Sequence, residues 1–149
     1  MESPAGIELG LASLRDVDQI LELEKASFGD DAFGRSLFMF HIATGRDGFI
    51  VARKDDRVVG YVLATRRGGD GLIMSIAVLP EFRRKGVGGS LMKAALAQLS
   101  KFKRVILQVD VANDEAREFY KGLGFAETGR VHKRYYPNGH DAIEMARQS

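Results

Sequence analysis

The stretch LIMSIAVLPEFRRKGVGG, residues 72–89, decides how this chain folds. Its first seven residues are almost continuously apolar, which is typical of a strand buried on both faces. After Pro80 come three consecutive cations and three glycines, and an apolar helix pattern follows them directly. Glycines let backbone amides approach a ligand closely, and the start of a helix favours an anion. The stretch therefore predicts a strand, a phosphate-binding turn and a helix in succession.

This turn differs from the two best-known glycine-rich loops. It lacks the Gly-x-x-x-x-Gly-Lys-Ser/Thr of a P-loop, and it lacks the third glycine and the distal acidic residue of a dinucleotide fingerprint. The pyrophosphate of a different coenzyme is therefore the expected ligand. The alternative is a solvated basic turn whose glycines only permit tight helix packing. The residues expected to bind the cofactor in this turn are Arg83, Arg84, Lys85, Gly86, Val87, Gly88 and Gly89.

Working outward, hydrophobic periodicity predicts strands and helices along the rest of the chain. Ser13 and Asp16 form a capping-box pattern before an amphipathic run that reaches Phe28. The polar turn at 54–57 separates two strand-like runs and indicates a hairpin. The expected strands are 7–11, 49–53, 58–65, 72–78, 105–111 and a final pair ending at 142–145, and the expected helices are 13–28, 33–43, 91–99 and 114–122.

Composition bounds the class of protein. With 149 residues, 45% of them hydrophobic, the chain fits one domain over residues 1–149, with an α/β mixed sheet. The net charge of +2 gives no overall attraction to nucleic acid, and the absence of cysteine excludes disulfides and thiolate catalysis. No stretch has the pattern of a signal peptide or the length of a membrane span, so we expect a cytoplasmic protein that binds no membrane.

Two segments carry a family resemblance. The strand end Val78-Leu79-Pro80 followed by the turn 83–89 resembles the cofactor signature of the GNAT superfamily of N-acetyltransferases, an Arg/Gln-x-x-Gly-x-Gly/Ala loop after V-x-P. Downstream, the strand 109–113 is similar to the second signature of that superfamily, in which an Asn begins a helix that ends near a tyrosine. The residues that match there are Asn113, Ala116, Phe119, Tyr120, Leu123, Gly124 and Phe125, and the resemblance covers about residues 49 to 145.

The resemblance implies the GNAT fold, a central mixed, mostly antiparallel sheet of about seven strands with about four helices. Its fourth and fifth strands, here 72–78 and 105–111, would splay into a V that admits acetyl-CoA. The family's general acid toward the leaving thiolate matches Tyr120, whose alternative role is a tyrosine of the core. The cofactor would further be bound by Ile76, Ala77, Val78 and Asn113, although Asn113 has the alternative role of a plain N-cap.

The tail from Arg134 to Met145 is similar to the ending of protein N-terminal acetyltransferases, especially the ribosomal-protein alanine type. That resemblance implies direct transfer of acetyl to the α-amine of a protein or peptide, with the paired tyrosines at the peptide entrance. One tyrosine of the pair would instead pack the sheet, because neighbours on a strand face opposite sides. The acceptor site is expected to contain Phe28, Asp31, Gln108, Tyr135 and Tyr136.

The sequence departs from that group at Gln108, where the related enzymes carry Glu or His as the candidate base. An amide cannot take a proton at neutral pH. Asp110 lies two residues on and faces the same side of the strand, so it is the first substitute, either as base or within a water relay. Other substitutes are Glu24, Asp30 and Asp31, and the three histidines, His41, His132 and His140, are expected at the surface or at a gate and not on a metal.

Three alternatives share parts of this pattern. An acetyltransferase for a small amine, such as a polyamine, amino sugar, amino acid or drug, would have the same cofactor site, with the acidic pair Asp30 and Asp31 near its acceptor. A non-catalytic CoA-binding module is motivated by Gln108. A nucleic-acid-binding domain is the weakest option, because the cations at 83–85 lack a surrounding basic face. The partners expected are acetyl-CoA and an amine, with the chain a monomer or, through its exposed strand edges, a homodimer.

Overall fold

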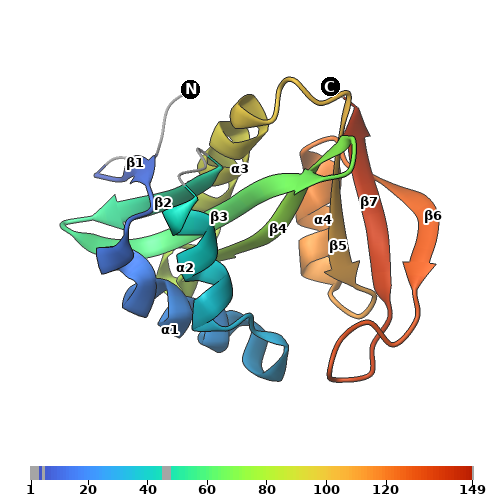
Figure 1. Cartoon of the computed structure of the whole chain (residues 1–149), viewed down its shortest axis with the longest axis horizontal. Helices are drawn as coiled ribbons and strands as arrows, with labels where there is room; N and C mark the ends of the chain where they lie inside the picture. Colours follow the sequence, from blue (N-terminus) through green and yellow to red (C-terminus); the bar gives the residue numbers. More distant parts are fainter. Residues whose placement is uncertain (1–3, 5, 45–47, 149) are drawn as a thin grey trace.

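The computed structural model describes residues 4, 6–44 and 48–148. Strands and helices follow the predicted order, and Figure 1 shows them assembled around one continuous sheet. Along the chain they are β1 (Glu8–Leu11), α1 (Val17–Phe28), α2 (Arg35–Ala43), β2 (Phe49–Lys54), β3 (Arg57–Arg67), β4 (Asp70–Val78), α3 (Val87–Gln98), β5 (Arg104–Asp110), α4 (Asp114–Gly122), β6 (Ala126–His132) and β7 (Ala142–Gln148).

The sheet has seven strands in the order β1-β2-β3-β4-β5-β7-β6. Every neighbouring pair is antiparallel except β4 and β5, which are parallel. A parallel pair needs a crossover connection, and α3 supplies it here. The predicted mixed, mostly antiparallel sheet with four helices is confirmed.

The two faces of the sheet are covered by different helices (Figure 1). On one face, α3 packs Leu91, Met92 and Ala95 into a core that also takes up Phe119 and Tyr120 of α4. On the other face, α1 packs Ile20 and its neighbours against Phe38 of α2 and the β2–β3 hairpin. We call these the α3–α4 face and the α1–α2 face.

The parallel strands β4 and β5 stay together for only a short distance. Their pairing joins Gly71–Ile73 to Val105–Leu107, whereas β4 remains paired with β3 as far as Val78, and β5 with β7 as far as Asp110. The β3–β4 register shifts beside Met74, which leaves that residue as the extra one of a bulge. A bulge bends its strand, so β4 turns away from β5 immediately after Ile73. The predicted V-shaped splay is confirmed, and Figure 1 shows the two strands diverging.

Predicted boundaries were wrong mainly at helix starts. The capping box of Ser13 and Asp16 is present, but it opens a short 3-10 turn, and α1 begins at Val17. The second helix begins at Arg35 instead of Phe33, because Gly34 has an extended backbone and serves as the N-cap. The Phe33 amide, before the helix, donates to the carboxylate of Glu24 at 2.8 Å. That bond pulls the α1–α2 loop onto the body of the protein.

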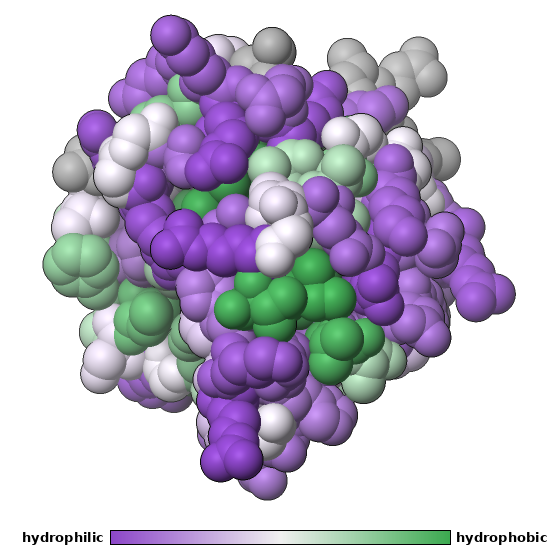
Figure 2. All heavy atoms as spheres, turned by 90° about the vertical axis from the view of Figure 1, so that its right-hand side faces the viewer, coloured by the Kyte–Doolittle hydropathy of each residue, from purple (hydrophilic) through white to green (hydrophobic). Residues whose placement is uncertain are grey.

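The sheet ends at an edge strand with a polar character. Residues of β6 are exposed along most of its length, and several of them are charged. Figure 2 shows that this side of the molecule is mostly hydrophilic, with a limited group of apolar residues at its centre. Charged edges oppose strand-to-strand association, so β6 gives no specific support to a sheet-extended dimer. Among the described residues, no helix is long and apolar enough to cross a membrane.

Candidate active site

The turn from Arg83 to Gly89 presents a row of backbone amides at the start of α3. Gly86 is the N-cap with φ of 86°, and Arg84 also has a left-handed φ of 62°. Within the described part of the chain, no amide from Arg84 to Gly89 donates a hydrogen bond to protein. Unpaired amides at a helix start carry partial positive charge and bind phosphate oxygens.

The two glycines in the first turn of α3 differ in the space around them. A Cβ added at Gly89 would meet nothing within 4 Å, whereas one at Gly88 would approach the Phe119 ring at 3.4 Å. Two of the three predicted cations are partly engaged, since Arg83 donates to the carbonyl of Val78 at 3.0 Å and Lys85 lies 5.8 Å from the Phe82 ring. In this turn the backbone amides are therefore freer to meet a ligand than the side chains of Arg83 and Lys85.

The opening between β4 and β5 leads from this turn into the sheet. Ile76, Ala77 and Val78 lie in the half of β4 that has left β5. That half has an unpaired backbone edge facing the opening, which can pair with an extended ligand. Asn113 caps α4 by accepting the Ala116 amide at 3.0 Å, so the plain capping role is present.

Tyr120 projects from α4 toward the same opening. Its ring packs against Phe119 and Phe125, and burial raises its pKa to about 12. The phenol is therefore protonated at neutral pH and available as a donor. Its charge state also influences the pKa values of Tyr61 and Tyr136, which belong to the α1–α2 side of the sheet.

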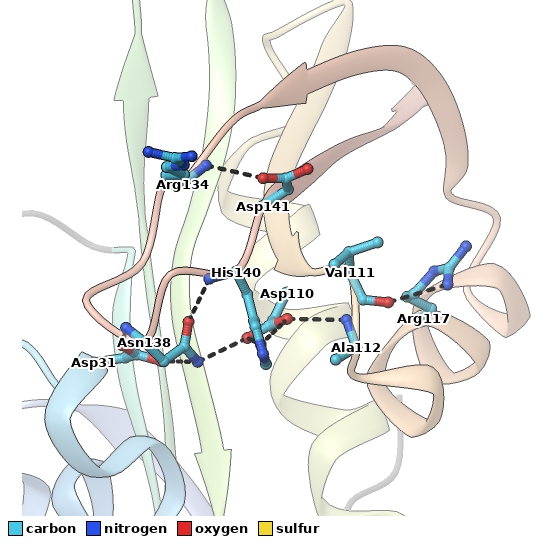
Figure 3. A network of polar contacts seen from close by, with 9 residues as sticks. All are labelled: Asp31, Asp110, Val111, Ala112, Arg117, Arg134, Asn138, His140 and Asp141. Atoms are coloured by element: carbon cyan, nitrogen blue, oxygen red, sulfur yellow. Dashed lines mark hydrogen bonds and ion pairs between the residues drawn. The ribbon is translucent and has the colours of Figure 1, made fainter.

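On the α1–α2 face, one side chain ties three separate segments together (Figure 3). The Asn138 amide nitrogen, on the β6–β7 loop, donates to Asp31 of the α1–α2 loop at 2.9 Å and to Asp110 at the end of β5 at 3.2 Å. His140 contacts the same Asp110 carboxylate through Nδ1 at 2.9 Å. The two loops that flank the end of β5 are therefore fixed relative to each other.

These contacts bear on Asp110 as a base. Burial alone would raise its pKa, but hydrogen bonds from the Ala112 amide, His140 and Asn138 outweigh burial and lower it. A lowered pKa makes the carboxylate a poor proton acceptor at neutral pH. The geometry instead gives Asp110 the role of an anchor for the β6–β7 loop.

Glu24 is likewise occupied. It is buried, and it accepts the Phe33 amide at 2.8 Å, the Ser75 hydroxyl at 2.9 Å and the Tyr61 hydroxyl. Burial, and then the charge of Glu24, raise the pKa of Tyr61 well above its ordinary value. Glu24 thus holds the acceptor-side loop to β3 and β4, which is a positioning task. Asp30 is exposed at the same loop.

The paired tyrosines follow β6 in the β6–β7 loop, and their rings contact each other edge to face, with centroids 5.0 Å apart. Tyr135 is 45% exposed and contacts the His132 ring, with centroids 5.6 Å apart. Tyr136 is half-buried, and burial raises its pKa well above the ordinary value. Further increases come from the nearby charges of Tyr135, Asp110, Tyr120 and Asp31. Of the two tyrosines, Tyr136 is therefore the more buried one, and its place in an acceptor site stays a prediction.

Three other residues named from the sequence are Phe28, Gln108 and His41, and all three are at least partly buried. Phe28 is half-buried and packs against the α1–α2 core. Both polar atoms of the Gln108 side chain are buried without a hydrogen-bond partner among the described residues. Of the two places predicted for the histidines, surface or gate, the surface is wrong for His41, because it is 8% exposed beside Phe40, and burial lowers its pKa. No group of three metal-ligating side chains occurs in the described ranges.

Sequence reasoning missed two features of this site. Asn138 was quoted only as part of the tail, although the Pro137-Asn138-Gly139 turn signal marks a residue placed at a loop tip. The Glu24–Tyr61–Ser75 contact joins residues 14 to 51 positions apart, and nothing in their local patterns links them.

Comparison with known proteins agrees with this geometry. The model of the acetyltransferase (GNAT) family matches residues 14–125. The chain is 34% identical over 150 residues to the N-alpha-acetyltransferase of Sulfurisphaera tokodaii, covering 91% of this chain and 89% of that protein. Ard1 from Thermoplasma volcanium superposes with a TM-score of 0.90 at 27% identity, covering 97% and 98% of the two chains.

A further solved structure shares the fold at lower identity. Arabidopsis thaliana Naa50, in complex with the bisubstrate analogue CoA-Ac-MVNAL, superposes with a TM-score of 0.82 at 23% identity. The superposition covers 97% of this chain and 100% of the Naa50 chain. The resemblance first drawn from the two signatures is thereby confirmed. The chain belongs to the GNAT family of acetyltransferases, which use acetyl-CoA as the acetyl donor.

Proposed function

We propose that this chain acetylates the N-terminal α-amine of a protein or peptide. The observation that carries the proposal is the β4–β5 opening itself, which has unpaired amides and Tyr120 on the α3–α4 face and the loops bridged by Asn138 at the end of β5 on the other side. One opening thus joins the predicted cofactor side to the predicted acceptor side. The name of the 34% identical relative, N-alpha-acetyltransferase, supports the same acceptor.

On the cofactor side, acetyl-CoA when bound supplies the thioester. The amides from Arg84 to Gly89 would bind its pyrophosphate, and the free edge of β4 at Ile76–Val78 would pair with its extended arm. Tyr120 would donate its hydroxyl hydrogen toward the departing sulfur, for which a protonated phenol is required. Each of these groups is in place before any ligand arrives, which lowers the cost of binding.

On the acceptor side, the Asp31–Asn138 bridge joins the α1–α2 and β6–β7 loops. An acceptor would approach Tyr120 beside Tyr136 and between these joined loops. The free end of an extended chain suits such an approach better than a residue in the middle of a folded surface. Asp31 already accepts two hydrogen bonds from Asn138, so it is less available to a free polycation than its sequence position indicated.

The chemistry of the amine points the same way. At pH 7.5 an α-amine with a pKa near 7.8 is about one-third neutral, whereas a lysine with a pKa near 10.4 needs about 4 kcal/mol to lose its proton. The site has Gln108 where related enzymes carry a base, and Asp110 and Glu24 are engaged elsewhere. A site without a strong general base can therefore use an α-amine, which is partly neutral already, more readily than a lysine.

The acceptor can be tested by acetyl-CoA-dependent release of free thiol. Peptides with free N-termini beginning Ala, Ser or Met are compared with N-blocked lysine peptides and with polyamines. We expect kcat/KM for the best free N-terminus to exceed that of any lysine peptide or polyamine at least 100-fold. Turnover confined to small amines would contradict the proposal, and CoA binding without any turnover would indicate a non-catalytic module.

Gly86→Glu tests the phosphate site. The substitution places a charged side chain at a left-handed N-cap and directs a negative charge at the ligand, so the Kd for CoA should rise at least tenfold. The matched control is Gly122→Glu at the end of α4, where an added Cβ meets nothing within 4 Å. Calorimetric titration with CoA measures both. Equal affinity in the two variants would mean that the pyrophosphate binds elsewhere.

Tyr120→Phe tests the proton donor. Phe keeps the ring contacts with Phe119 and Phe125 but removes the hydroxyl, so kcat should fall about 100-fold while the Kd for CoA changes by less than about twofold. Because burial raises the pKa of Tyr120 to about 12, the wild-type rate should show no loss from its ionisation up to about pH 10. An unchanged kcat in the variant would remove Tyr120 from the chemistry.

A further inference from the structure

The α1–α2 face of β5 and β7 contains a buried polar side chain whose hydrogen bonds are unmade among the described residues. Gln108 faces the side of the sheet on which Asp110 also lies, and both atoms of its amide are buried without a partner among the described residues. Its direct cross-strand partner on β7 is Glu144. Directly opposed residues have Cβ atoms about 4.5–5.5 Å apart on the same face, so the two side chains are neighbours.

Like Glu24, Glu144 is a buried carboxylate, but it receives fewer hydrogen bonds than Glu24 does. It is 4% exposed, and its carboxylate forms no ion pair among the described residues. One oxygen accepts the Thr128 hydroxyl at 2.9 Å. A buried carboxylate without a counter-charge is unfavourable for stability, and an apolar residue would pack there at lower cost.

The charged and titratable groups around Glu144 do not neutralise it directly. The pKa of Arg104 on β5 is raised mainly by its hydrogen bonds to Asp70 and in small part by the charge of Glu144. The Arg104 guanidinium makes those two hydrogen bonds to Asp70 at 3.3 and 2.8 Å. On β6, Thr128 supplies only a neutral hydroxyl. His132, also on β6, has a buried Nε2 with no hydrogen-bond partner in the described chain.

Other carboxylates near the acceptor are each committed to several donors. Asp110 accepts the Ala112 amide, Asn138 and His140, while Glu24 accepts the Phe33 amide and two hydroxyls. Asp31 accepts twice from Asn138. Glu144 accepts a single hydroxyl, and it stands next to the position at which related enzymes carry their base.

We infer that Glu144 is the carboxylate that receives the proton of the acceptor amine, in place of a carboxylate at position 108. This inference rests on the proposed function. β5 lies between the β4–β5 opening and β7, so Gln108 would stand between Glu144 and an amine bound in that opening. The Gln108 amide orients a water molecule that spans the two, accepting and donating hydrogen bonds without itself taking a proton.

The transfer balances with this assignment. The amine nitrogen forms a bond to the acetyl carbon as the bond from that carbon to sulfur breaks. The nitrogen loses one proton, through the water, to Glu144. The sulfur gains one proton from Tyr120, and exchange with solvent returns both side chains to their starting states. The products are the acetylated amine and free CoA, with no further reactant.

Glu144→Gln is the direct test, because the amide oxygen can still accept the Thr128 hydroxyl while the basicity is lost. With the best free-N-terminus peptide, kcat should fall about 100-fold, and the rate should climb with pH over the range in which wild type is level. Adding Gln108→Glu to this variant should restore kcat to within about tenfold and flatten the profile. Glu127→Gln, an exposed β6 carboxylate paired with Arg117, is the matched control and should match wild type.

The outcomes separate this inference from the proposed function. A wild-type protein that acetylates no peptide with a free N-terminus would contradict the proposed function, independently of the result for the Glu144 variant. With an active wild type, Glu144→Gln that keeps its kcat and pH profile, or a loss that Gln108→Glu does not repair, overturns the inference. If Glu144→Gln does not fold, Gln108→Glu alone serves, because two adjacent carboxylates should shift the acidic limb of kcat/KM by about one pH unit or more. An unmoved limb would also overturn the inference.

Discussion

The parting of β4 from β5 after Ile73 is the constraint on which the rest of the site depends. Two parallel strands held together for three residue pairs and then separated by a bulge at Met74 leave an unpaired backbone edge inside a sheet. Unpaired edges inside a protein need a partner. A ligand that is itself extended and rich in amides can supply the missing hydrogen bonds, and CoA has such an arm. The phosphate-binding turn at the start of α3 then fixes which way the cofactor lies.

The same opening explains why the helices divide into two pairs. α3 and α4 cover the face that presents the amides and Tyr120, while α1 and α2 cover the face on which an acceptor would arrive. On that second face, Glu24 and Asn138 hold loops in place by several hydrogen bonds each. Buried carboxylates there are used mainly for positioning, which is why a residue outside the usual position, Glu144, becomes the candidate for accepting a proton.

The sequence predicted what depends on local pattern and on signatures. The element order, the hairpin at 54–57 and the turn before α3 follow from periodicity, glycine placement and cations, whereas the residues assigned to the cofactor come from the family resemblance and stay a prediction. Features that join distant residues were out of reach: the bulge at Met74, the three donors on Glu24 and the Asn138 bridge. The burial of single polar side chains could not be predicted from the sequence either. His41 was expected at the surface or at a gate, and nothing in the local pattern indicated that the acidic Glu144 is buried.

The central claim is that cofactor and acceptor meet in the β4–β5 opening from opposite faces of the sheet. The most direct measurement is a crystal structure with a conjugate of CoA and a short peptide joined through the acetylated N-terminus. The account predicts the pyrophosphate on the amides from Arg84 to Gly89, the CoA arm along β4 beyond Ile73, and the peptide leaving on the α1–α2 face beside Tyr136. A peptide that leaves on the α3–α4 face, or a CoA arm outside the opening, would contradict it.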